Sequence, residues 1–290
     1  MTESITGKTI VVGIIADPIP HTLSPQMHNA AFKQLGLDYV YVPFKVKSLE
    51  LRKAVEGMRA FNIRGLNVTL PHKVAVMQFL DRLDPIAESI GAVNTIVNDG
   101  GILTGFNTDA TGFLQTLRGN GIDPKGKRIL MVGAGGAARA IGTALAGQGA
   151  NLVILNRKKG LPWAEDIAFR LKQSYNANVK AMELTNENLK IEIKNAEILV
   201  NATSIGMNPD KESTPVPAEL LGPGITVFDI VYNPSPTRLT REAKAAGAAV
   251  IEGVEMLVQQ GAVSFEKWTG AKAPVSVMRQ TVLNEVQNEK

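Results

Sequence analysis

The feature that most constrains this sequence is a glycine-rich segment in the middle of the chain. The segment Gly133–Ala138 (GAGGAA) directly follows an apolar run that ends at Val132 and opens a stretch of helical spacing that ends near Gly147. A Gly-x-Gly-x-x-Ala pattern between a strand and a helix is typical of dinucleotide-binding domains. The first glycine makes a tight turn, the second lets a pyrophosphate approach the backbone, and the helix N-terminus offers N–H groups to the phosphates. We therefore expect a Rossmann-type domain, the alternative being a glycine-rich turn without a ligand.

The end of the next strand indicates which dinucleotide is bound. An NAD enzyme usually places Asp or Glu there to hold the ribose 2′-hydroxyl. Here Asn156 ends the strand and the cationic residues Arg157, Lys158 and Lys159 follow it. A guanidinium suits a 2′-phosphate. The sequence therefore favours NADP, with NAD as a possible second cofactor and a solvated basic loop as the alternative explanation of the charges.

The N-terminal third alternates apolar runs with segments of helical spacing. The expected strands are residues 10–16, 39–44 and 65–70, and the expected helices between them are residues 25–35 and 49–61. Strands separated by helices of this length indicate βαβ units and a largely parallel sheet. The pattern changes at residues 94–111, which are typical of a hairpin with an Asn-Asp-Gly-Gly turn at 98–101. A helix over residues 109–120 follows.

The alternation restarts after a turn-rich connector, residues 121–127, which is a candidate domain boundary. The expected strands of this second part are residues 128–132, 151–156, 197–203, 226–232 and 248–253. A helix is expected after each of the first two strands, and the stretch between the second of these helices and the third strand has only a weak pattern. The sequence therefore predicts an α/β protein with two sheets.

Composition excludes several kinds of chemistry. The chain has no cysteine, and its three histidines do not form a His-Glu-x-x-His pattern, so we expect no metal site and no thiol nucleophile. The net charge of +4 is too small to suggest nucleic acid as a partner. No apolar stretch is long enough for a membrane span, and the first residues lack the apolar core of a signal peptide. We expect a cytoplasmic protein that binds small molecules, as a monomer or a homodimer.

Polar motifs in the N-terminal part are not explained by packing. They are HTLSP (residues 21–25), NVTLPHK (67–73), GAVNT (91–95) and NTD (107–109). Each alone has a structural explanation: Ser24 and Asp109 could cap helices, and Lys73 could be an exposed helix residue. Their occurrence together beside a dinucleotide-binding motif favours a functional role.

With these motifs the chain resembles the shikimate dehydrogenase family, including its quinate/shikimate branch. The resemblance runs in family order through HTLSP, NVTLPHK, GAVNT, NTD, GAGGAARA, NR, NATSIGM, YNP and GVEMLVQQ, and it covers nearly the whole chain. It implies an N-terminal α/β substrate domain with a mixed, mainly parallel sheet (1–110), a Rossmann-type NADP domain (111–253) and a C-terminal helical segment that returns to the first domain (254–290). The implied reaction is the reversible, NADP-dependent reduction of 3-dehydroshikimate to shikimate in aromatic amino acid and chorismate biosynthesis.

The resemblance also implies roles for individual residues. Thr22, Ser24 and Tyr232 would bind the substrate carboxylate, and the residues near the ring hydroxyls and the reacting oxygen would be Thr69, Lys73, Asn94, Asp109 and Gln260. The residues expected to contact the cofactor are Gly133, Ala134, Gly135, Gly136, Ala137, Asn156, Arg157, Lys158, Thr203, Ile230 and Gly253. The chain departs from the common family pattern at Thr22, where Ser is usual, and at Lys158, where Thr is usual. Thr22 keeps the hydroxyl but adds a methyl group to the carboxylate pocket. Lys158 keeps the loop basic but changes one phosphate contact.

Lys73 and Asp109 are the expected proton-transfer pair. An ammonium group can protonate the developing alkoxide during ketone reduction and, as an amine, accept the proton during alcohol oxidation. Asp109 would orient Lys73 and share the substrate hydroxyl. His72 is expected to be structural, because adjacent residues in a helical turn point in different directions.

Two alternatives stay open at this point. A quinate/shikimate dehydrogenase using NAD or NADP would differ near Thr22, Ser24 and Tyr232, because quinate carries an extra hydroxyl on the carboxylate-bearing carbon. A non-catalytic paralogue that only binds the ligands is disfavoured, since a pure binder has no need for both Lys73 and Asp109.

Overall fold

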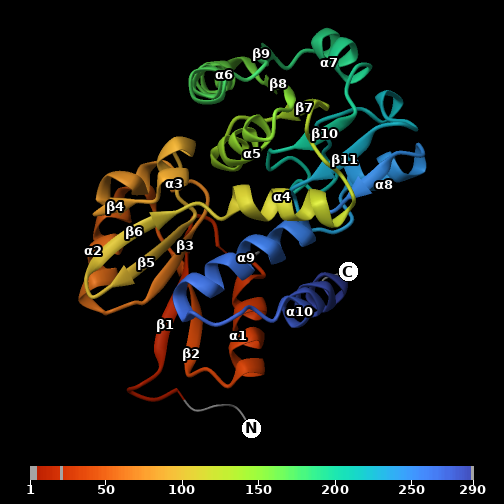
Figure 1. Ribbon diagram of the computed structural model, residues 1–290. Coiled ribbons are helices and arrows are strands. Elements are labelled where there is room, and N and C mark those ends of the chain that lie inside the picture. Colours follow the sequence, from red (N-terminus) through yellow and green to blue (C-terminus); the bar gives the residue numbers. More distant parts are fainter. Residues whose placement is uncertain (1–4, 20–21, 289–290) are drawn as a thin grey trace. The chain divides into compact units, whose positions relative to one another are not determined.

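The computed structural model describes residues 5–19 and 22–288, which form two compact units (Figure 1). The first unit contains the described residues up to Thr108 together with Val258–Asn288. The second unit contains Asp109–Leu257. The chain therefore leaves the first unit once and returns to it for its last two helical segments.

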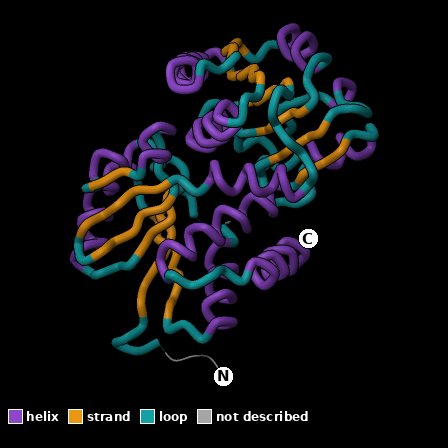
Figure 2. The backbone as a smooth tube through the Cα atoms, in the orientation of Figure 1, coloured by secondary structure: helices purple, strands orange, loops and turns teal. Residues whose placement is uncertain are grey.

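A mixed six-stranded sheet forms the centre of the first unit (Figure 2). Its strands, in spatial order, are β2 (Tyr39–Lys45), β1 (Ile10–Ala16), β3 (Gly65–Val68), β5 (Thr95–Asp99), β6 (Ile102–Phe106) and β4 (Arg82–Leu83). β1 pairs in parallel with β2 and β3, whereas β5 is antiparallel to both β3 and β6. The predicted hairpin is confirmed: Gly100 and Gly101 adopt positive φ angles of 61° and 94° between β5 and β6, as a tight turn requires. The two-residue β4 had no sequence signal.

Helices cover this sheet and bury an apolar core against it. They are α1 (Ser24–Leu35), α2 (Leu51–Ala60), α3 (Pro85–Ile90), the part of α9 (Gly253–Thr269) from Val258 on, and α10 (Val275–Asn288), with short 3-10 turns at Ser48–Glu50 and Ala75–Phe79. The predicted helix over residues 49–61 is thus shorter, because its first turn is a 3-10 turn. α10 packs on α1. Trp268 fixes the end of α9 to the sheet: its Nε1 donates to the Ile96 carbonyl at 3.0 Å.

The second unit has an all-parallel sheet in the doubly wound strand order. The strands, in spatial order, are β12 (Ala249–Ile251), β11 (Thr226–Asp229), β10 (Ile198–Asn201), β7 (Arg128–Val132), β8 (Asn151–Asn156) and β9 (Val179–Glu183). Read from β9, this is the order 3-2-1-4-5-6, whose direction reverses between β7 and β10. Ligands bind at such a reversal, outside the carboxyl ends of the strands. β9 lies in the stretch whose pattern was weak, since its side chains are mostly only half-buried.

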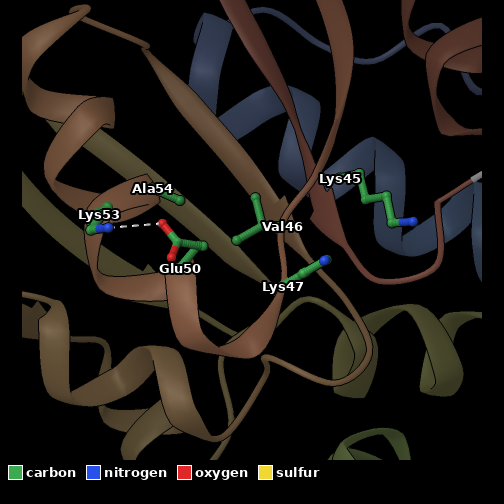
Figure 3. Close-up of a pocket in the computed structure, with 6 residues that line it drawn as sticks. All are labelled: Lys45, Val46, Lys47, Glu50, Lys53 and Ala54. Carbon is green, nitrogen blue, oxygen red and sulfur yellow. Dashed lines mark ion pairs between the residues drawn. The ribbon is translucent and has the colours of Figure 1, made fainter.

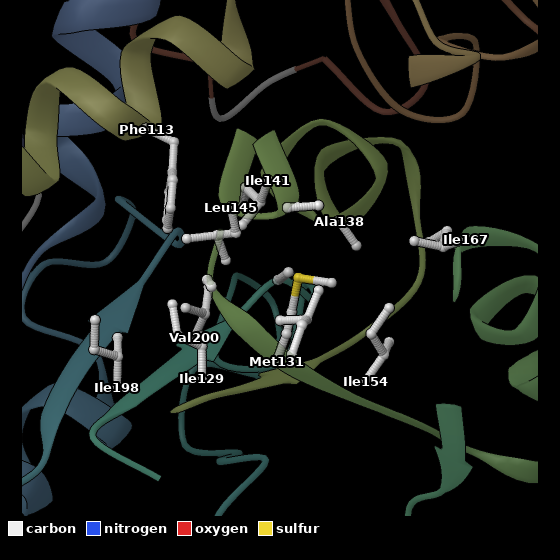
Figure 4. Close-up of a cluster of buried hydrophobic side chains, with 14 of the residues drawn as sticks. Phe113, Ile129, Met131, Ala138, Ile141, Leu145, Ile154, Ile167, Ile198 and Val200 are labelled. Atoms are coloured by element: carbon white, nitrogen blue, oxygen red, sulfur yellow. The ribbon is translucent and has the colours of Figure 1, made fainter. Parts of the chain in front are cut away.

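Helices cover this sheet as well, and the core between them is apolar. The helices are α4 (Asp109–Gly119), α5 (Gly136–Gly147), α6 (Leu161–Tyr175), α7 (Asn186–Ile193) and α8 (Arg238–Ala245). Figure 4 shows Met131 of β7 and Val200 of β10 facing Ile141 and Leu145 of α5. The expected α/β architecture is confirmed. Among the described residues no helix is long and apolar enough to cross a bilayer.

Candidate active site

In the first unit, the polar motifs gather at one edge of the sheet. β1, β3 and β6 end at this edge, and β5 begins there, because β5 is antiparallel to its two neighbours. The segments that leave these strand ends carry Thr22 and Ser24, Thr69 and Lys73, Asn94, and Thr108. His21, the first residue of the HTLSP motif, lies outside the described residues. The topology therefore brings four motifs that are far apart in sequence to one edge.

Asn94 and Gln260 are in direct contact at this edge. Asn94 Nδ2 donates to Gln260 Oε1 at 3.4 Å and to Thr108 Oγ1 at 2.9 Å. The amide orientation of Asn94 is set by a backbone donor, since the Thr108 N–H donates to Asn94 Oδ1 at 2.8 Å. Asn94 is buried, and Gln260 is half-buried on α9. These two predicted substrate residues form one amide pair.

Thr22 and Ser24 lie between β1 and the first turn of α1. Ser24 is the first residue of α1 and Leu23 is its N-cap, so the Ser24 side chain does not cap the helix. The Ser24 N–H donates to Thr22 Oγ1 at 3.4 Å. The structural explanation of Ser24 as a helix cap is therefore wrong, and a buried hydroxyl stands at the N-terminus of a helix that has no acidic residue in its first turn. Such a position favours an anion.

Thr69 and Lys73 follow β3 in a turn that leads into the 3-10 turn Ala75–Phe79. The carbonyl of Lys73 accepts from the N–H of Val93, next to Asn94, at 2.8 Å, which places the Lys73 backbone beside the Asn94 strand end. His72 is buried and its Nε2 lies 2.7 Å from the Val46 carbonyl. As expected, His72 is held in the protein interior while Lys73 is half-buried.

Asp109 and Tyr232 belong to the second unit. Asp109 follows Thr108 directly and is the first residue of α4. Tyr232 is half-buried in the segment after β11. The two compact units thus divide the predicted substrate residues between them.

In the second unit, the glycine-rich segment has the conformation that a dinucleotide requires. Gly133 has a φ of 112°, and a Cβ there would lie 2.7 Å from the Ala202 carbonyl oxygen and 2.8 Å from a Thr203 methyl. At Gly135 an added Cβ would meet no atom within 4 Å, so the backbone is open on that side. α5 begins at the next residue, with no side-chain cap and no acidic residue in its first turn. Open backbone before an uncapped helix N-terminus fits a pyrophosphate.

Asn156 shapes the basic loop that follows β8. Its Nδ2 donates to the Gly160 carbonyl at 2.8 Å, and its Oδ1 accepts from the Arg157 N–H at 3.0 Å. Arg157 and Lys158 are both exposed. Because β8 neighbours β7, this loop starts at the same sheet edge as Gly133, whose N–H donates to the Leu155 carbonyl at 2.8 Å.

Thr203, Ile230 and Gly253 complete this edge. A Cβ on Gly253 would lie 2.5 Å from the Ile230 carbonyl oxygen, so the two backbones are in close contact. The Ile230 N–H donates to the Asn201 carbonyl at 3.2 Å, and Thr203 Oγ1 donates to Asn201 Oδ1 at 2.7 Å. All predicted cofactor residues therefore lie along the carboxyl ends of β7, β8, β10 and β11, or next to them.

A buried carboxyl supports this edge. Asp229, the last residue of β11, accepts from Asn201 Nδ2 at 2.9 Å, from the Val231 N–H at 3.0 Å and from Thr237 Oγ1 at 2.7 Å. Burial raises the pKa of Asp229 to about 6, and the three hydrogen bonds oppose this shift. Asp229 was not among the predicted site residues, although an Asp that ends an otherwise apolar run was a visible signal.

A cavity of about 480 Å³ lies elsewhere on the first unit. Its lining residues are Lys45, Val46, Lys47, Glu50, Lys53 and Ala54 (Figure 3). Lys53 pairs with Glu50 at 3.2 Å, and Lys45 lies 3.8 Å from Asp17. None of the predicted site residues lines this cavity, and we give it no role in the site.

Comparison with known proteins identifies the family. The model of the shikimate dehydrogenase substrate binding domain matches residues 14–96, and that of the shikimate 5'-dehydrogenase C-terminal domain matches residues 253–283. The shikimate dehydrogenase (NADP(+)) of Methanopyrus kandleri is 48% identical over 98% of both chains. The chain belongs to the shikimate dehydrogenase family.

Solved members of the shikimate dehydrogenase family share the fold of the whole chain. Shikimate 5-dehydrogenase from Listeria monocytogenes, in complex with shikimate and NAD, is 43% identical, with a TM-score of 0.88 over 97% of this chain and 98% of that chain. A shikimate dehydrogenase in complex with NADP+ is 40% identical, with a TM-score of 0.91 over 98% of both chains. The predicted family membership is confirmed, while the roles of individual residues stay predictions.

Proposed function

We propose that this member of the shikimate dehydrogenase family catalyses the reversible reduction of 3-dehydroshikimate to shikimate with NADPH. The observation that carries the proposal is the presence of two complete polar edges in one chain. One edge of the first unit holds amide, hydroxyl and ammonium groups suited to a polyhydroxylated ring acid. The strand-reversal edge of the second unit holds the open glycine turn and the basic loop suited to a dinucleotide phosphate.

The first unit would be the substrate domain and the second the NADP domain. The first unit includes the last two helical segments of the chain, of which α9 carries Gln260. In this assignment Thr22, Ser24 and Tyr232 bind the substrate carboxylate. The ring oxygens are contacted by Thr69, Asn94 and Gln260.

NADP is the proposed cofactor, and it would supply the hydride. Gly133 to Ala137 would hold the pyrophosphate at the start of α5. Arg157 and Lys158, both exposed and at the edge next to that turn, would hold the 2′-phosphate. Asn156 would position the loop through its two hydrogen bonds to the loop backbone.

Lys73 would move the proton of the reacting oxygen. During reduction its ammonium donates a proton to that oxygen as negative charge develops, and during oxidation the neutral amine takes the proton back. Asp109 would orient Lys73 and accept a hydrogen bond from the substrate hydroxyl. The half-buried position of Lys73, in a turn fixed by the bond of its own carbonyl to Val93, suits a group that must be held in place.

Initial rates test this function. The enzyme is assayed with shikimate and with quinate, each with NADP+ and with NAD+. We expect the highest kcat/KM with shikimate and NADP+. A preference for quinate would overturn the substrate assignment, and equal use of NAD+ would overturn the role given to the basic loop.

Two variants test the residue roles. Lys73→Ala is expected to lower kcat by about 10²- to 10⁴-fold, the usual contribution of a positioned acid–base group. Lys47→Ala is the matched control, since Lys47 is an exposed lysine of the same unit that lines the separate cavity. Arg157→Ala is expected to raise the KM for NADP+ and to leave the KM for NAD+ unchanged. Near-normal turnover of the Lys73 variant would refute its catalytic role.

A further inference from the structure

We propose that Ser264 on α9 is a positioning residue that fixes the orientations of Asn94 and Gln260 through a buried hydroxyl network. Ser264 is fully buried and lies one helical turn after Gln260 on α9. Its Oγ lies 2.8 Å from Thr95 Oγ1 and 3.2 Å from Thr108 Oγ1. This inference rests on the proposed function, in which Asn94 and Gln260 contact the substrate.

Four residues around the amide pair form this network, which we call the hydroxyl network. They come from four different segments of the first unit and are all buried: Asn67, Thr95, Thr108 and Ser264. Asn67 Nδ2 lies 3.2 Å from both Thr95 Oγ1 and Ser264 Oγ, and Asn67 Oδ1 accepts from the Tyr41 hydroxyl at 2.7 Å. The network therefore joins α9 to the edge where β3 ends and β5 begins.

Thr95 and Ser264 link the hydroxyl network to the amide pair. Thr95 Oγ1 donates to Asn94 Oδ1 at 2.9 Å. Thr95 Oγ1 also lies 2.8 Å from Ser264 Oγ, whose single hydroxyl proton is directed either to Thr95 or to the Gln260 carbonyl at 3.1 Å. Ser264 therefore contacts both Thr95, which bonds to Asn94, and the Gln260 backbone, so one hydroxyl links the segments that carry the two amides.

Gln260 is fixed from two sides. Its Oε1 lies 3.4 Å from Asn94 Nδ2 and 3.5 Å from Thr108 Oγ1, both of which can donate. Its backbone carbonyl lies 3.1 Å from Ser264 Oγ, one turn further along α9. An amide oxygen that faces two donors directs its NH₂ group to the other side. The network therefore determines which of its two polar atoms Gln260 presents to a ligand.

Removing the Ser264 hydroxyl would leave buried groups without their partner. Asn67, Thr95 and Thr108 all lie within 3.2 Å of Ser264 Oγ, and in Ser264→Ala their hydrogen bonds must rearrange around Asn94. Losing one partner of buried polar groups weakens an equilibrium by about 5- to 20-fold or more. Because the affected groups orient the substrate amides, we expect the loss in substrate binding.

Steady-state kinetics of Ser264→Ala test the proposal. We expect the KM for shikimate to rise about 5- to 20-fold while the KM for NADP+ stays within about twofold, because the proposed NADP residues belong to the second unit. A general loss of packing would not separate the two constants in this way. An unchanged shikimate KM, or an equal rise in both constants, would overturn the inference.

A matched pair at Thr95 guards against misfolding of the Ser264 variant. Thr95→Val keeps the shape and removes the hydroxyl, whereas Thr95→Ser keeps the hydroxyl and removes a methyl. Thr95→Val should reproduce the shikimate KM rise, and Thr95→Ser should stay near the wild-type value. The reverse order would show that packing, not hydrogen bonding, is what matters, and would overturn the proposal.

Thr281→Val on α10 is the control for loss of a hydrogen bond from a side-chain hydroxyl to a carbonyl of its own helix. Its Oγ1 donates to the carbonyl four residues earlier, Val277, at 2.9 Å, as Ser264 does on α9, but it lies outside the network. We expect wild-type kinetics for this variant, and a shikimate KM as high as in Ser264→Ala would count against the network. If the wild-type enzyme itself fails to oxidise shikimate with NADP+, the proposed function fails, which is a separate result from a normal KM in Ser264→Ala.

Discussion

We predict that His28 on α1 makes the stability of the first unit dependent on pH. The side chain is fully buried in an aromatic cluster, stacked on Tyr41 at 4.6 Å between ring centroids and 5.3 Å from the ring of Trp268. Neither of its ring nitrogens has a hydrogen-bond partner among the described residues. Burial lowers the pKa of His28 from 6.5 to about 3, because a charged imidazolium would lose its hydration without gaining a partner.

The sign and size of the effect follow from linkage. Since the pKa is lower in the folded protein, the unfolded chain binds the proton more tightly, and stability is lost as the pH falls below 6.5. Each pH unit between the two pKa values costs about 1.4 kcal/mol of unfolding free energy. At pH 5 the loss is about 2 kcal/mol, and it continues to grow until the pH reaches about 3.

His28→Leu removes the titrating group and keeps an apolar side chain of similar size. We expect the free energy of unfolding of this variant, relative to wild type, to be about 2 kcal/mol more favourable at pH 5 than at pH 8. A change in packing contributes equally to the difference in unfolding free energy at both pH values, so it cancels when the two values are compared. The titration of other groups, which both proteins share, cancels in the same way.

Urea denaturation followed by tryptophan fluorescence measures this difference. The sequence has two tryptophans, and the exposed Trp163 can be replaced by Phe in every protein, which leaves the buried Trp268 as a reporter of the first unit. Phe32→Leu, in the same cluster, is the control and should destabilise equally at pH 5 and pH 8. If His28→Leu also differs from wild type by the same amount at both pH values, His28 does not titrate as argued.

Three further predictions concern single positions. Gly65→Ala should destabilise the first unit strongly, because its Cβ would lie 2.0 Å from Trp268 Nε1. Thermal unfolding measures this, and a Tm equal to that of wild type would contradict it. Gly133→Ala should raise the KM for NADP+ with little change in that for shikimate, because its φ of 112° and the Ala202 carbonyl at 2.7 Å disfavour any side chain; an unchanged KM would refute this. The raised pKa of Asp229 means that the folded state binds the proton more tightly, so the contribution of Asp229 to the free energy of unfolding falls by about 3 kcal/mol as the pH rises from 3.8 to about 6. Asp229→Asn removes this contribution, and an equal difference in unfolding free energy between wild type and variant at pH 4 and at pH 7 would contradict it.

The fold was predictable where local pattern and packing agree. The short, β-branched apolar run from Ile10 to Ala16 and the glycine segment that directly follows the strand ending at Val132 are local patterns that agree with how these segments pack. β9 was missed because a strand at the edge of a sheet with half-buried side chains shows no apolar run. β4 was missed because two residues are too short to carry a period.

Candidate site residues could be proposed from motifs only where single residues stand out in the sequence. Lys73, Asp109 and the glycines have recognisable neighbours in the sequence. Ser264 does not, since a serine inside an amphipathic helix looks like any small residue, and the positioning role proposed for it depends on Thr95, which is 169 positions away in the chain. Contacts of this range come from strand pairing and helix docking, which one sequence does not reveal.

On α9, the residue that anchors the helix to the sheet, Trp268, and the proposed substrate residue, Gln260, lie on the same face. Gln260, Ser264 and Trp268 are spaced four residues apart, so they lie on the same face of the helix. Trp268 sets the height of α9 on the sheet through its bond to the Ile96 carbonyl, and only a glycine at position 65 leaves room for its ring. Gln260 lies about 12 Å further along the helix axis, at a rise of about 1.5 Å per residue. A shift of the anchor must therefore move Gln260 against Asn94 by a similar distance. On this argument Gly65→Ala should impair shikimate binding even at temperatures where the protein stays folded.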